Sequence, residues 1–181
     1  MALKKQWYEI TAPKMFGERV VGETLAVDPK QLVGRKVQVS IVEVSKDFSR
    51  FFVKLNFKIT DVSGTRAATK LVGHDVMSER IYRMVQRYVR RVDVIQDVVT
   101  KDGVKVRVKT VFTLARRVNS ALKTAARKVA FDFIEKTATA MNFDDLMQSV
   151  IKGDIQHRLR RECSKVYPVA NVEIRKTEVM G

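Results

Sequence analysis

Cysteine and histidine, the residues that most often build disulfides and zinc sites, are almost missing from this sequence. The 181 residues contain one cysteine, Cys163, and two histidines, His74 and His157. A single thiol cannot form an internal disulfide, and three soft ligands are too few for a structural zinc site. We therefore expect no bound metal and a fold that is stabilised by packing.

Long apolar runs are missing as well. No segment reaches the roughly 18 apolar residues that cross a bilayer, and residues 1–7 lack the apolar core of a signal peptide. We therefore expect no membrane partner and a cytoplasmic protein.

Hydrophobic residues make up 45% of the chain and charged residues 30%, a mixture that is too apolar for a disordered protein. We expect one globular domain over residues 31–181, preceded by an extended arm over residues 1–30.

Acidic side chains are too few to balance the basic ones. The chain has 35 Lys and Arg against 20 Asp and Glu, a net charge of +15, and the segment 103–131 contains no acidic residue at all. Such a surface attracts polyanions, because each basic group that meets a phosphate releases condensed counterions. DNA, RNA and anionic lipid are the candidates, and lipid is the weakest of the three.

Apolar and polar side chains alternate in the first third of the chain, as half-buried strands require. Residues 37–41 and 51–59 form one pair of predicted strands, joined by a turn at residues 46–49. Residues 67–72 are a weaker candidate for a third strand.

A second hairpin is predicted from residues 92–100 and 104–113, since the Asp102-Gly103 dipeptide between them favours a tight turn. Alternation along its second strand places three basic side chains on one face, about 7 Å apart. Such a row repels itself unless an anion lies against it. The three residues are Lys105, Arg107 and Lys109.

Helical spacing follows each hairpin. Ser78 is a good N-cap for a helix with apolar positions Ile81, Tyr82, Val85, Tyr88 and Val89. A helix over residues 119–141 has a predicted buried stripe of Leu122, Ala126, Val129, Phe133 and Met141. Asp144 and Asp154 begin two shorter helices, and residues 172–174 form a last strand. This order predicts an α+β fold, an antiparallel β-barrel-like sheet with helices packed around it.

The first 30 residues combine prolines and glycines with two aromatic residues, Trp7 and Tyr8. We interpret them as an irregular arm. Two alternatives remain open: a frayed terminus, or an arm that orders on RNA with Trp7 or Tyr8 in a groove or stacked on a base.

No combination of residues suggests catalysis. His74 precedes Asp75 and would make a general base, but no nucleophile is spaced around this pair. Cys163 is better explained as a small buried hydrophobe than as a reactive thiol. Asp144 and Asp145 point about 100° apart on a helix, so capping explains them. The glycines form no phosphate-binding loop. We expect no enzyme, no cofactor and no small-molecule substrate; the alternative is a free RNA-processing or RNA-modifying enzyme.

Arginine predominates around residues 80–91 and 116–117, and its planar guanidinium binds phosphate bidentately and stacks on bases. The sequence contains no recognition helix, zinc finger, basic zipper or aromatic RNP consensus, so structured RNA bound by shape and phosphate contacts is favoured. The candidate RNA-binding residues are Lys4, Lys5, Trp7, Tyr8, Lys14, Arg83, Arg87, Arg90, Arg91, Lys105, Arg107, Lys109, Arg116, Arg117, Lys123, Arg127 and Lys128.

Several short segments, taken in order, carry a resemblance to a known family. They are residues 7–16 (WYEITAPKMF), 22–25 (GETL), 73–75 (GHD), 100–103 (TKDG), 107–109 (RVK), 167–169 (YPV) and 172–176 (VEIRK). In this order they resemble the small-subunit ribosomal protein family S-one-e, also written S-three-A-e, of archaea and eukaryotes.

The resemblance implies a β-barrel-like core with surrounding helices. It also implies a structural constituent of the small ribosomal subunit, bound to ribosomal RNA on the platform near the messenger RNA exit. The implied partners are small-subunit ribosomal RNA and neighbouring small-subunit ribosomal proteins, with messenger RNA near the exit as a further candidate.

Overall fold

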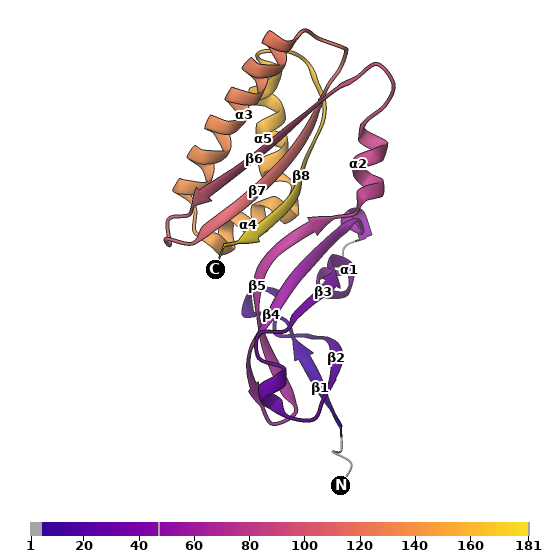
Figure 1. Cartoon of the computed structure of the whole chain (residues 1–181), viewed down its shortest axis with the longest axis vertical. Coiled ribbons are helices and arrows are strands. Elements are labelled where there is room, and N and C mark those ends of the chain that lie inside the picture. Colours follow the sequence, from indigo (N-terminus) through magenta and orange to yellow (C-terminus); the bar gives the residue numbers. More distant parts are fainter. Residues whose placement is uncertain (1–4, 47, 181) are drawn as a thin grey trace. The chain divides into compact units, whose positions relative to one another are not determined.

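The computed structural model of the chain describes residues 5–46 and 48–180, and Figure 1 shows its strands and helices. These residues contain eight strands and five α-helices. The chain divides into two compact units, Met1–Asp75 (unit 1) and Val76–Gly181 (unit 2). The predicted α+β class is confirmed.

Unit 1 is built mainly from strands. These are β1 (Gln6–Thr11), β2 (Val20–Ala26), β3 (Lys36–Ser40), β4 (Val53–Ser63) and β5 (Arg66–Val76), with one helix, α1 (Ile41–Ser45), and three 3-10 turns at Lys14–Phe16, Pro29–Gln31 and Phe48–Arg50. The predicted pairing of residues 37–41 with 51–59 is confirmed as the antiparallel β3–β4 pair.

The sheet of unit 1 differs from the expected antiparallel barrel in two ways. β1 pairs antiparallel with β2 but parallel with β5, so the sheet is mixed. Its strand order is β2-β1-β5-β4-β3, and the described strands β2 and β3 are not paired, so it does not close. Alternation along a strand reports which face is buried but not the direction of its neighbour, which is why the sequence did not reveal the parallel pair.

The first 30 residues form part of this sheet and are not an irregular arm over the described residues 5–30. Tyr8 and Ile10 of β1 are 3% and 2% exposed, and Tyr8 lies in one core cluster with Ala26, Leu32 and Ile59. The expected boundary at residue 30 therefore falls inside unit 1. Residues 1–4 lie outside the described residues.

Unit 2 contains a three-stranded antiparallel sheet with β7 in the centre. Its strands are β6 (Arg90–Val99), β7 (Lys105–Leu114) and β8 (Val169–Val179). The predicted second hairpin is confirmed, with its turn at Lys101-Asp102-Gly103. Gly103 has φ +77, which glycine adopts without a steric penalty, and an Asp102 carboxylate oxygen accepts a hydrogen bond of 3.0 Å from the backbone N–H of Phe143.

Three helices cover one face of this sheet: α3 (Ser120–Ala140), α4 (Phe143–Lys152) and α5 (Asp154–Ser164), as Figure 1 shows. The Asn119 side chain caps α3 by accepting a hydrogen bond of 3.1 Å from the N–H of Leu122. The buried positions of α3 are Ala126, Ala130, Ile134 and Ala138. Only Ala126 belongs to the predicted stripe. The four buried positions are spaced four residues apart, and three of them are alanines, whose small side chains let the helix lie close to the sheet. The larger side chains of the predicted stripe lie half-buried beside this contact.

The helix expected from Ser78 is shorter than predicted. Helix α2 spans Ser78–Met84, and only Ile81 and Met84 are buried. Tyr82, Val85 and Tyr88 are 71%, 37% and 70% exposed. Helical spacing of apolar residues predicts a buried stripe only where a neighbouring element covers them, and no such cover exists here within the described residues.

Candidate nucleic-acid interface

Two of the arginines near α2 stabilise unit 2 through ion pairs. Arg80 donates two hydrogen bonds, of 3.3 and 3.2 Å, to Oε1 of Glu173 on β8, and Glu173 is only 5% exposed. Arg91 forms a forked contact with Asp93 at 2.7–3.0 Å. Arg90 is half-buried, and its Nε has no hydrogen-bond partner among the described residues. Arg80 and Arg91 therefore offer less free charge than the sequence suggests.

Arg83 and Arg87 are different, because both are exposed. In the part of the chain that the structure describes, no carboxylate pairs with either of them. The guanidinium of Arg87 lies 5.2 Å from the ring centroid of Tyr88, a cation–π contact. Both side chains are therefore available to an external anion.

The basic row on β7 already has anions beside it. Asp97 on β6 accepts two hydrogen bonds from Arg107, at 2.7 and 2.8 Å. Glu178 on β8 accepts from Lys109 at 3.1 Å and from Lys176 at 2.6 Å. Cross-strand carboxylates thus relieve the repulsion, which corrects the expectation that an external anion must lie against this row.

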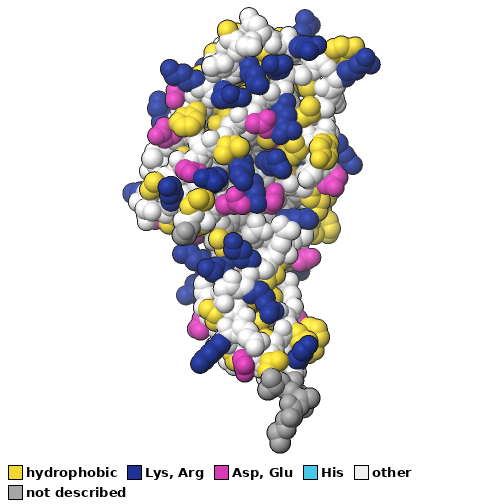
Figure 2. All heavy atoms as spheres, viewed as in Figure 1, with side chains coloured by type: hydrophobic (Ala, Val, Ile, Leu, Met, Phe, Trp, Pro, Cys, Tyr) yellow, Lys and Arg dark blue, Asp and Glu magenta, His cyan; other side chains and the backbone are white. Residues whose placement is uncertain are grey.

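The charges on this face shift the pKa values of both carboxyl groups. The hydrogen bond from Arg107 lowers the pKa of Asp97, and hydrogen bonds from Lys176 and then Lys109 lower the pKa of Glu178. Basic and acidic side chains are accordingly intermixed over much of the surface seen in Figure 2. Lys105, the remaining member of the row, is exposed and has no ion pair among the described residues.

Helix α3 and the connection before it carry a group of free cations. Arg116, Arg117, Arg127 and Lys128 are exposed and Lys123 is half-buried, and none of them pairs with a carboxylate within the described residues. Helix α5 packs against α3 and adds two exposed arginines, Arg158 and Arg161. Sequence reasoning missed this pair, although three arginines within positions 158–161 were the signal for it.

The aromatic candidates of β1 separate into one that is accessible and one that is not. Trp7 is 63% exposed, while Tyr8 on the opposite face of the strand is 3% exposed. Tyr8 is a core residue, so the hypothesis that it stacks on a base is wrong. Lys5 and Lys14 are exposed, and Lys4 lies outside the described residues.

The histidine and the cysteine considered for catalysis lie in the core. His74 is 1% and Cys163 0% exposed, and burial raises the pKa of the Cys163 thiol to about 11. A search of residues 5–46 and 48–180 finds no cluster of three metal-ligating side chains and no helix long and apolar enough to cross a membrane.

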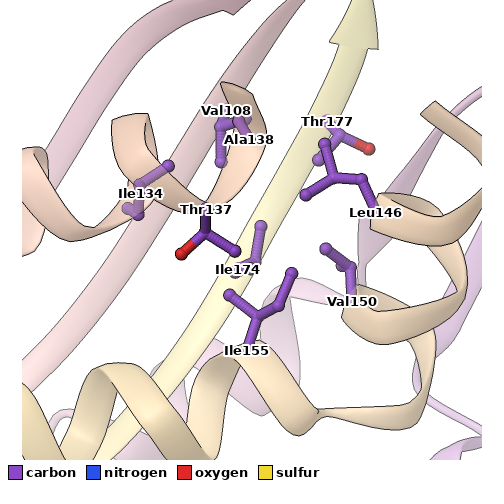
Figure 3. Close-up of a pocket in the computed structure, with 9 residues that line it drawn as sticks. All are labelled: Val108, Ile134, Thr137, Ala138, Leu146, Val150, Ile155, Ile174 and Thr177. Atoms are coloured by element: carbon purple, nitrogen blue, oxygen red, sulfur yellow. The ribbon is translucent and has the colours of Figure 1, made fainter. Parts of the chain in front are cut away.

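A small void lies between the sheet of unit 2 and its helices. Figure 3 shows side chains from β7, β8, α3, α4 and α5 surrounding it, among them Val108, Ile134 and Ile174. Its volume is about 10 Å³, barely the space of one water molecule. The void is a packing defect of the core and too small for a ligand.

Fold and charge together define a basic α+β protein with a group of free cations around α2, α3 and α5. The family model for the ribosomal S3Ae family matches residues 2–181. The chain belongs to this family, which confirms the resemblance seen in its short segments.

Archaeal relatives cover almost the whole chain. The protein named small ribosomal subunit protein eS1 from Saccharolobus islandicus is 38% identical over 97% of this chain and 85% of its own length. The protein of the same name from Methanothrix thermoacetophila is 39% identical over 98% of this chain and 84% of its own length. That from Saccharolobus solfataricus is 36% identical, over 97% and 85%.

Proposed function

We propose that this protein is a structural constituent of the small ribosomal subunit and that it binds ribosomal RNA through its unpaired basic side chains. Membership of the ribosomal S3Ae family supports the first part, as do the names of its relatives. The observation that carries the second part is the group of exposed cations around α2 and α3 without carboxylate partners in the described residues. The core placement of His74 and Cys163 gives no support to the alternative, a free RNA-processing or RNA-modifying enzyme.

The binding is dominated by phosphate contacts. Guanidinium groups bind phosphate oxygens bidentately, and each neutralised phosphate releases counterions. The contributing basic residues are, in unit 1, Lys5 and Lys14, and in unit 2, Arg83, Arg87, Arg116, Arg117, Lys123, Arg127 and Lys128. The exposed ring of Trp7 adds a face on which a base stacks. Lys105, Arg107 and Lys109 contribute less, because Asp97 and Glu178 already neutralise two of them. Arg91 contributes less because it pairs with Asp93, and Arg90 is a further contributing residue.

We further propose that the protein lies on the platform of the small subunit in the cytoplasm, near the messenger RNA exit. Its neighbours there are other small-subunit ribosomal proteins, and messenger RNA passes close by. The family resemblance is the support for this location.

Sedimentation of a lysate from the native cells tests the proposal. We expect nearly all of the protein, detected by antibody across a sucrose gradient, in the small-subunit fractions and in heavier ones. A free RNA-processing enzyme would remain near the top of the gradient, and that distribution would refute the proposal.

A further inference from the structure

Two exposed tyrosines lie six residues apart in the sequence, each next to a free arginine of unit 2. Tyr82 and Tyr88 are 71% and 70% exposed, whereas Tyr8 is buried and Tyr167 half-buried. A single exposed apolar residue needs no explanation. Two exposed rings within seven residues, YRMVQRY, do need one. We call residues 82–88 the arginine–tyrosine segment.

The backbone at one of the two tyrosines, Tyr88, has a sterically unfavourable conformation. Tyr88 has φ +70, the left-handed region, which is uncommon for a residue with a large side chain. Glycine would adopt this conformation freely. The Tyr88 ring adds nothing to the core of the described residues. The stability of the fold therefore does not explain why a tyrosine stands at this position.

The base of the segment is firmly attached to unit 2. Ile81 and Met84 are buried, and Arg80 pairs with Glu173 of β8 at 3.2 Å. The exposed side chains of Tyr82 and Arg83, between these anchors, therefore start from a fixed stretch of backbone. A binding surface held in this way loses little conformational entropy when a ligand is bound.

The chemistry of the segment matches unpaired nucleotides. A tyrosine ring offers a flat apolar face on which any base stacks, and Arg87 already lies over the Tyr88 ring at 5.2 Å. Arg83 and Arg87 have no carboxylate partner in the described part of the chain and are suited to phosphate. Bases of a duplex are stacked on one another, so only unpaired nucleotides can use the rings.

We propose that the arginine–tyrosine segment is a nucleobase-stacking site, in which Tyr82 and Tyr88 stack on unpaired bases of RNA while Arg83 and Arg87 bind the flanking phosphates. This inference rests on the proposed function, RNA binding, and adds to it a preference for single-stranded segments. A protein partner is the competing occupant, since tyrosine and arginine also dominate protein interfaces. The net charge of +15 favours RNA, and so does the lack, among residues 5–46 and 48–180, of a carboxylate that pairs with either arginine.

The test compares two RNA probes with the full-length protein. One probe is a stem flanked by unpaired adenosines, and the other is the same stem with blunt ends. The variants are Tyr82→Ala, Tyr88→Ala, Tyr88→Phe and Tyr88→Gly. Phe48→Ala is the matched control, because it removes a ring that is 75% exposed in unit 1.

Each alanine variant should weaken binding of the probe with unpaired adenosines by about 5- to 150-fold, the range that one base–aromatic stack supplies. Binding of the blunt stem should stay unchanged. Tyr88→Phe should bind like wild type. Tyr88→Gly should lose binding of unpaired adenosines without losing thermal stability, because glycine relieves the positive φ; this variant separates binding from folding.

If the alanine variants bind the probe with unpaired adenosines as tightly as wild type does, and wild type binds both probes equally, the stacking site is refuted. The surface would then be left to a protein partner. A loss with Phe48→Ala as large as with Tyr88→Ala would also refute it, since the effect would then not be specific. Failure of the wild-type protein to bind either probe would instead refute the proposed function.

Discussion

The surface around α3 and the basic row of β7 should differ sharply in how much they contribute to RNA binding. Five basic residues at α3, namely Arg116, Arg117, Lys123, Arg127 and Lys128, have no carboxylate partner within the described residues. Replacing all five with Gln should reduce the slope of log K against log salt by about 3.5 to 4.5, if each contacts one phosphate and each contact contributes about 0.7–0.9. The row on β7 also has several cations, but two of them are paired with carboxylates. Replacing Lys105, Arg107 and Lys109 with Gln should reduce the slope by about 1 or less, since only Lys105 is unpaired.

Filter binding of structured small-subunit ribosomal RNA over a salt series measures both slopes. Melting curves show whether each variant is still folded, which matters most for the β7 variant because it loses the ion pairs to Asp97 and Glu178. An equal reduction in both variants would show that the carboxylates do not neutralise the row. A larger reduction in the β7 variant would place the main RNA contact on the sheet and refute the reasoning.

Three further predictions concern stability and reactivity. Asp102→Ala should destabilise the protein by about 0.5–2 kcal/mol, measured by urea unfolding, because it removes the acceptor for the N–H of Phe143 at the start of α4; an unchanged midpoint would contradict this. Deleting residues 1–16 should unfold or strongly destabilise unit 1, since Tyr8 and Ile10 belong to its core, and a cooperative melting transition at the wild-type temperature would contradict this. With its pKa raised to about 11, Cys163 should resist a thiol reagent at pH 8 until denaturant is added, because only the thiolate reacts.

Local patterns predicted the elements that depend on neighbouring residues. The Asp102-Gly103 turn and the alternation on both sides of it specify the β6–β7 hairpin, since turn conformation and strand register are local properties. Asn119 marks the start of α3 for the same reason: its side chain caps a backbone N–H only three residues away. The family resemblance was likewise visible in short segments of the sequence.

Features that depend on distant residues were missed. Alternation was present in β1, where Tyr8 and Ile10 face inward and Trp7 faces outward, but the prolines and glycines nearby suggested an arm. The strand is stabilised by β2, which follows it beyond these prolines and glycines, and by a parallel partner, β5, more than fifty residues away in the sequence.

The charge row on β7 failed as a guide for the same reason. Its compensating carboxylates, Asp97 and Glu178, come from two other strands. The electrostatic environment of a row of charges can therefore be inferred from the sequence only after the register of the sheet is known. Free cations were better predicted at α3, where the segment 103–131 contains no acidic residue.

The most direct test of the central claim is a structure of the small ribosomal subunit purified from the native cells, determined by electron cryomicroscopy. We predict density for this chain on the subunit, with the guanidinium groups of Arg83, Arg87 and Arg116 within hydrogen-bonding distance of ribosomal RNA phosphates. Absence of the chain from the subunit, or a bound chain whose three arginines face only solvent or protein, would contradict it.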